Sequence, residues 1–191
     1  MNQNRHQNNR RNFLSKMLIT GVSGITLLSS SAYARGRNKT SATKLTAKQE
    51  AAIFFMYQEE KVARDVYITL GEMYPDENTF ASIQLSEQRH IDSVEALCDK
   101  YGISKKGVNE GDVGNFVLEE LQKLYNTMVA RGTDSLYEAL KVGEDIEITD
   151  IADLEEASVG MPADVQNVFS SLKEGSLSHL DAFQSAISRT I

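Results

Sequence analysis

Ionisable side chains occupy five positions at which amphipathic helices would be expected to carry apolar residues. They are Glu60, Glu87, His90, Glu147 and His179. Each continues a stripe of apolar residues that recurs every three or four positions, so each is expected to face a helical core. Burying an unpaired carboxylate is costly, so inward charges on several helices need a common partner. Carboxylate oxygens and imidazole nitrogens suit iron, manganese or zinc, which predicts a buried metal site.

The spacing of two pairs supports a metal site. Glu87 and His90 are three residues apart, so one helix face presents both side chains. Glu147 and Asp150 repeat this geometry. Helices that each contribute a carboxylate, together with Glu-x-x-His elements, form the di-metal sites of some four-helix bundles. We therefore expect six ligands: Glu60, Glu87, His90, Glu147, Asp150 and His179.

Simpler interpretations stay open at these positions. Glu-x-x-His is a weak motif by itself. Glu59 or Glu60 could be a solvated residue, because residues 59–65 form charge pairs typical of an exposed helix. Arg64 or Arg89 could neutralise an inward carboxylate without a metal.

The fourth predicted helix leaves a further choice. Asp150 could lie at the surface beside Asp153, and Glu144 competes with Asp150 as the second carboxylate of that helix. Three tyrosines are expected in the core, namely Tyr67, Tyr125 and Tyr137.

Five amphipathic helices would position these residues, and no strand-like alternation of useful length accompanies them. Thr46 is a plausible N-cap, Pro75 marks the end of the first helix, and Gly102 stops the second. The pattern predicts an all-α bundle of four long helices, with one shorter helix between the two long pairs. The predicted ranges are 46–74, 78–101, 115–131, 134–157 and 162–188.

Composition narrows the classes of protein. The chain has 191 residues, one cysteine and a formal net charge of −7. A single cysteine, Cys98, excludes an intrachain disulfide framework and any cysteine-based metal cage. The acidic balance argues against a general nucleic-acid binder.

The first 34 residues differ from the rest. They carry four basic residues and no acidic ones, which gives +4 and leaves 16 Lys+Arg against 27 Asp+Glu, or −11, for the remainder. A short apolar stretch, 17–28, leads to a small-residue run ending at Ala34. Such a segment predicts an export signal, and it is too short for a stable membrane span. We expect cleavage near Ala34, a polar linker over 35–45, and a helical domain over 46–191.

Residues 10–16 (RRNFLSK) resemble a twin-arginine signal. The resemblance implies transport by the twin-arginine export machinery after folding in the cytoplasm. Folding before export would allow a metal to be inserted inside the cell. The mature protein is therefore expected to be extracytoplasmic, in the periplasm or cell envelope.

The helical domain resembles the ferritin-like superfamily. In rubrerythrin-type proteins, a glutamate of the first helix is followed seven residues later by tyrosine, as at Glu60 and Tyr67, and residues 80–90 resemble their second helix with its Glu-x-x-His. The chain resembles more closely a prokaryotic family of ferritin-like proteins catalogued as a domain of unknown function. That likeness is carried by residues 60–67, 86–90, 146–154 and 175–183.

The resemblance implies a ferritin-like four-helix bundle with a di-metal site, but it has one departure. Rubrerythrin-type proteins carry Glu-x-x-His in the last helix, whereas this chain has Ser176 three residues before His179. Asp150 could supply the missing oxygen from the neighbouring helix; otherwise a second metal would be poorly held. No four-cysteine module is present, so a built-in iron–sulfur centre is excluded.

Two iron ions are the expected cofactor, with manganese or zinc as alternatives. His90 and His179 would each hold one ion, Glu87 with Glu60 or Glu147 would bridge or cap the pair, and Asp150 would be a terminal ligand. These expectations favour an oxidoreductase of peroxidase or ferroxidase type that uses dioxygen or peroxide. The alternative is a non-catalytic metal-binding or partner-binding bundle, or a metal-free adaptor. Bundles of this type often form a homodimer.

Overall fold

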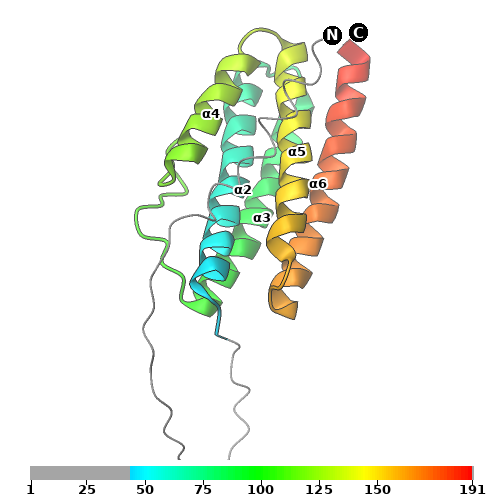
Figure 1. Ribbon diagram of the computed structural model, residues 1–191. Coiled ribbons are helices and arrows are strands. Elements are labelled where there is room, and N and C mark those ends of the chain that lie inside the picture. Colours follow the sequence, from blue (N-terminus) through cyan, green and yellow to red (C-terminus); the bar gives the residue numbers. More distant parts are fainter. Residues whose placement is uncertain (1–43, 191) are drawn as a thin grey trace, which may run out of the picture. The chain divides into compact units, whose positions relative to one another are not determined.

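Five helices account for most of residues 44–190, the part of the chain that the computed structural model describes (Figure 1). The predicted export signal and residues 35–43 of the predicted linker lie outside this part, so they stay predictions. Leu45, at the end of that linker, is buried. The helices are α2 (Ala47–Met73), α3 (Asn78–Tyr101), α4 (Glu119–Gly132), α5 (Leu136–Ser158) and α6 (Ala163–Thr190).

Local signals set the ends of the long helices, and those at Thr46 and Gly102 are the ones that the sequence predicts. Thr46 caps α2 in a capping box, in which its hydroxyl accepts from the Gln49 N–H while its own N–H donates to the Gln49 side chain. Gly102 ends α3 with φ of 71°, a left-handed conformation that glycine adopts without strain. Ser135 caps α5 by accepting from the Glu138 N–H.

The short helix differs from the expectation. It was predicted from residue 115, but α4 begins at Glu119. The N–H groups of Val117 and Leu118 instead donate to Oε1 of Gln58 on α2, and the N–H of Phe116 donates to Gln122. Hydrogen bonds to side chains thus replace the first helical turn.

The helices pack as two pairs joined by short turns, α2 with α3 and α5 with α6 (Figure 1). Contacts between α2 and α5 and between α3 and α6 bring the pairs together, and α4 packs against α2 and α5. The described residues thus form the expected all-α architecture. The placement of Tyr137 in the core is wrong, because that side chain is 41% exposed near the start of α5.

The middle of α2 is buried on every side from Phe55 to Tyr67. Three other helices pack on it, and the segment 103–118 covers its remaining face, where the Lys61 ammonium donates to the Asp112 carbonyl over 2.8 Å. The interpretation of residues 59–65 as pairs on an exposed helix is therefore wrong. Among residues 44–190, no helix is long and apolar enough to cross a membrane.

Candidate metal centre

Four helices bring the six predicted ligands into the interior. All six are buried, with 1 to 8% of each residue exposed. One comes from α2, two each from α3 and α5, and one from α6: Glu60, Glu87, His90, Glu147, Asp150 and His179.

Glu87 lies between the two histidines. Its Oε2 is 2.9 Å from Nδ1 of His90, and its Oε1 is 2.7 Å from Nδ1 of His179. The two imidazole rings stack with their centroids 5.3 Å apart. Glu87, His90 and His179 each offer a ligand atom within 4.8 Å of the others, so this trio could hold one metal ion.

Two further carboxylates approach the histidines, Glu60 from α2 and Glu147 from α5. Oε2 of Glu60 is 3.2 Å from Nδ1 of His90. Oε2 of Glu147 is 3.6 Å from Nδ1 of His179. Each histidine therefore faces two carboxylates through its Nδ1 atom, so Nδ1 is the ring nitrogen directed into the cluster.

Hydroxyl groups fix the outer oxygens of the α5 carboxylates. The Tyr67 hydroxyl donates to Oε1 of Glu147 over 2.6 Å, and the Ser176 hydroxyl donates to Oδ2 of Asp150 over 2.6 Å. The second oxygen of Glu147, Oε2, faces Nδ1 of His179, and the second oxygen of Asp150, Oδ1, has no hydrogen-bond partner. Such outer contacts orient metal ligands in known sites.

Two carboxylate oxygens of the cluster are buried without a hydrogen-bond partner. They are Oε1 of Glu60 and Oδ1 of Asp150. Buried polar groups nearly always have a hydrogen-bond partner, because a group without one loses its hydration and gains no hydrogen bond in exchange. Two unpaired carboxylate oxygens beside two imidazoles and two further carboxylates are a set of donors that a divalent cation would satisfy, so the residues fit a metal.

The histidines are held protonated by their neighbours. Burial acts to lower the pKa of His90, but contacts with Glu60 and Glu87 outweigh it and raise the pKa to about 11. Burial likewise acts to lower the pKa of His179, but contacts with Glu147 and Glu87 outweigh it and raise this pKa to about 9. Burial acts to raise the pKa of Glu87, but the two histidines lower it to about 2.

The other carboxylates are not fully compensated. Burial raises the pKa of Glu60 and the contact with His90 lowers it, and the result is a pKa of about 7. Burial and the nearby Glu87 raise the pKa of Glu147 to about 8. Burial, Glu60 and Glu147 raise the pKa of Asp150 well above its usual value. Four carboxylates lie close to two imidazoles, so the metal-free cluster keeps protons on some of its carboxylates, and a bound cation would take the place of those protons.

A glycine makes room for one of the histidine rings. A Cβ atom at Gly175 of α6 would lie 2.5 Å from Nε2 of His90. The absence of a side chain at residue 175 thus lets the His90 ring approach α6, beside His179.

The alternatives left open by the sequence can now be compared with the structure. Glu144 pairs with Lys141 and lies outside the cluster, so it does not replace Asp150. Arg89 is exposed, and the Arg64 guanidinium is bound to Asp65. Neither arginine neutralises the cluster.

Sequence reasoning missed a second acidic pair beside the cluster. Glu59 and Glu60 are both buried, so the idea that one of them is solvated is wrong. Glu59 interacts with Asp153 of α5, which is itself partly buried. The spacing of Asp153 three residues after Asp150 was a signal, because it places both on one face of α5.

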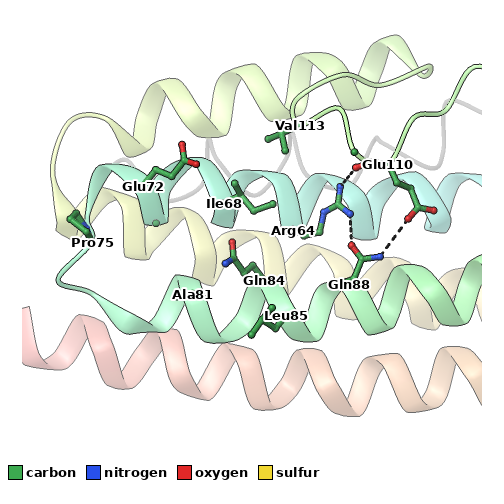
Figure 2. A pocket seen from close by; sticks show the side chains of 12 residues that line it. Arg64, Ile68, Glu72, Pro75, Ala81, Gln84, Leu85, Gln88, Glu110 and Val113 are labelled. Atoms are coloured by element: carbon green, nitrogen blue, oxygen red, sulfur yellow. Dashed lines mark hydrogen bonds between the residues drawn. The ribbon is translucent and has the colours of Figure 1, made fainter.

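A separate pocket of about 700 Å³ lies between α2, α3 and residues 110–113 (Figure 2). None of the six cluster residues lines it. Figure 2 shows the Arg64 guanidinium between Gln88 and the Glu110 carbonyl, to which it donates over 2.6 Å. The polar groups at this wall are thus engaged with each other.

Comparisons with known proteins place the cluster within a matched region. The model of a family described as an uncharacterized protein domain (DUF2202) matches residues 49–190. Over 140 residues the chain is 37% identical to uncharacterized protein MJ0754 of Methanocaldococcus jannaschii, a match that covers 73% of this chain and 75% of that protein. The crystal structure of hypothetical protein MJ0754 from Methanococcus jannaschii is similar with a TM-score of 0.73 and 33% identity, over 84% of this chain and 87% of that one.

Proposed function

Because the chain belongs to the DUF2202 family and buries six potential ligands at one place, we propose that it is a ferritin-like di-metal carboxylate protein with two iron ions. The observation that carries the proposal is the position of Glu87. One of its oxygens faces His90 and the other faces His179, at 2.9 and 2.7 Å. A carboxylate with a different histidine at each oxygen suits a bridge between two ions.

The remaining ligands divide between the two histidines. Glu60 lies next to His90, and Glu147 lies next to His179. Asp150 completes the set from α5, with Oδ1 free and Oδ2 held by Ser176. Tyr67 and Ser176 are positioning residues, because each fixes one oxygen of a ligand carboxylate.

We assign the protein to the oxidoreductases of peroxidase or ferroxidase type. An iron pair in an oxygen-rich ligand set supplies the electrons for reducing dioxygen or peroxide. His90 and His179 would release a proton each when a metal ion binds, and Glu147 and Glu60 would do so where they are protonated.

The segment before the described residues supports export. A basic start, a short apolar stretch and the Ala34 ending would direct the folded, metal-loaded chain to the periplasm or cell envelope. The intact mass of the exported chain tests this, with a mature chain beginning at Arg35 as the expected result. An exported chain of full mass would contradict it.

Metal analysis after anaerobic loading with Fe(II) tests the metal centre. Two irons per chain are expected in the wild type, with loss of at least one in His90→Ala and in His179→Ala. His6→Ala, measured like the others in the full-length chain, is the matched control, because it removes the same side chain from the predicted export signal. A wild type that binds no metal while its helices stay folded would overturn the proposal.

A non-catalytic metal-binding protein is the second candidate. The compact trio of Glu87, His90 and His179 favours it, because those three residues suffice for a single ion. One tightly held zinc per chain, with no spectral change when peroxide is added to the iron-loaded form, would support this candidate over the di-iron protein.

A further inference from the structure

Two carboxylates extend the metal centre toward the surface. Glu59 of α2 precedes the ligand Glu60 and is 6% exposed. Asp153 of α5 follows the ligand Asp150 by three residues and is only partly buried. The charges of Asp153 and Asp150 both act on Glu59. Asp153, Glu59 and Asp150 therefore form a series of neighbouring carboxylates that begins at a partly exposed residue and ends in the centre.

Glu59 and Asp153 interact with each other, but one oxygen of each carboxylate in this series has no hydrogen-bond partner. Oε2 of Glu59, Oδ2 of Asp153 and Oδ1 of Asp150 are buried and accept no hydrogen bond. Among residues 44–190, no lysine, arginine or histidine lies within ion-pair distance of Glu59 or Asp153. Keeping such carboxylates buried is costly unless something positive is bound or a proton is shared.

The hydrogen bonds of the cluster explain why Asp150 joins the two sites. Ser176 occupies Oδ2 of Asp150, and Oδ1 stays free. Glu59 and Glu60 are adjacent in α2, so the same turn of that helix serves the centre and the pair. A cation bound at Glu59 and Asp153 would thus be next to two ligands of the centre.

We propose that Glu59 and Asp153 form a divalent-cation loading site, which binds an incoming metal ion and passes it to the centre through Asp150. The proposal rests on the proposed metal centre and adds how that centre is filled. It assigns a role in the rate of metal uptake to Glu59 and Asp153, whereas the six ligands determine how much metal is held.

The rate effect follows from electrostatics. Neighbouring charges of one sign raise the local concentration of the opposite ion, and such steering can speed binding by roughly 10- to 1000-fold. Replacing Glu59 by glutamine or Asp153 by asparagine keeps the shape of the side chain and removes its charge. Each replacement should therefore slow the filling of the centre without changing its capacity.

Stopped-flow binding of Co²⁺ to the full-length, metal-free chain measures this rate through the absorption of the bound ion. We expect Glu59→Gln and Asp153→Asn to load about tenfold more slowly than the wild type, with the same number of ions bound at the centre at saturation. Glu174→Gln is the matched control, because it removes one exposed acid from α6 and should load at the wild-type rate. Circular dichroism confirms that each variant keeps its helices.

Each other outcome contradicts a distinct claim. A wild type that binds no Co²⁺ and no Fe(II) would overturn the proposed metal centre. Normal wild-type binding with unchanged rates in both variants would overturn only the loading site, and would leave Glu59 and Asp153 as a pair that shares a proton. If Glu59→Gln abolished binding at saturation, Glu59 would be a ligand of the centre and its loading role would be wrong. The partly exposed Asp153 provides an independent test should Glu59→Gln fail to fold.

Discussion

Ser176 contacts the proposed metal centre through its hydroxyl group. Its Oγ lies 2.6 Å from Oδ2 of Asp150 and 3.1 Å from the Leu172 carbonyl, and the residue is 1% exposed. A serine is too short to reach the place that a glutamate would fill at this position. Instead it holds Asp150, a carboxylate from the neighbouring helix, with one oxygen directed away from α6. The expectation that Asp150 supplies the oxygen absent from residue 176 is consistent with this contact.

Ser176→Ala should weaken metal binding. Removal of an outer hydrogen bond to a ligand typically costs 10- to 100-fold in affinity, so we expect a loss of about tenfold or more. Titration calorimetry with Co²⁺ gives the affinity. Ser178→Ala is the matched control, since Ser178 lies on the same helix, is exposed and donates only to the Glu174 carbonyl. Equal affinities in the two variants would show that Ser176 does not position Asp150.

At the scale of the element, α2 combines Glu60, a proposed metal ligand, with a buried charge network. Asp65 accepts from the Lys61 ammonium at 2.6 Å and from the Arg64 guanidinium at 2.7 Å. It also accepts from the N–H of Gly114 at 2.9 Å. Asp65 therefore connects the segment 103–118 to α2 by a hydrogen bond. That segment covers a face of the helix that would otherwise be exposed to solvent.

Asp65→Asn should destabilise the protein strongly. It leaves two buried cations with no full negative charge beside them, and breaking a buried ion pair typically costs about 3–5 kcal/mol. Urea unfolding followed by circular dichroism measures the free energy of unfolding. Asp76→Asn, at an exposed position after α2, should change it by less than about 0.5 kcal/mol. A loss at Asp65 no larger than at Asp76 would mean that the network does not hold α2 to the segment.

The same helix shows how far the sequence predicts the structure. Its ends follow from local signals at Thr46 and Pro75, and Glu60 follows from the period of the apolar stripe. The burial of Lys61 and Asp65 could not be predicted in this way, because it depends on a distant segment folding over them. For the same reason Glu59 was not recognised, since its partner Asp153 lies 94 residues away.

At the scale of the whole molecule, the cluster forms where two helix pairs that are distant in sequence meet. The α2–α3 pair contributes Glu60, Glu87 and His90, and the α5–α6 pair contributes the other three proposed ligands. Neither pair balances its own charge, so their association brings like charges together. The stability of the metal-free protein should therefore depend strongly on pH and on bound cations.

The direction of that pH dependence follows from the pKa shifts. The folded-state pKa values of Glu60 and Glu147 are raised to about 7 and 8, so in the metal-free protein each stabilising contribution is lost as pH rises above the unfolded value of about 4.5. His90 and His179, raised to about 11 and 9, contribute fully below about pH 6.5 and lose this as pH rises through their folded values. Glu87, lowered to about 2, acts oppositely and loses its contribution only as pH falls below about 4.5.

The metal-free protein should therefore be most stable near about pH 5, and its free energy of unfolding should fall steadily toward about pH 8. A bound divalent ion should reverse this trend, because it needs deprotonated histidines and carboxylates, and at about 100 times its Kd it adds about 2.7 kcal/mol. Urea unfolding with EDTA or with saturating Co²⁺ at several pH values compares the two forms. Glu147→Gln should flatten the metal-free curve, whereas Glu144→Gln, outside the cluster, should leave it unchanged. Metal-free stability that rises between pH 5 and 8 would contradict the charge balance argued for the centre, because it would require the cluster to bind fewer protons when folded than when unfolded.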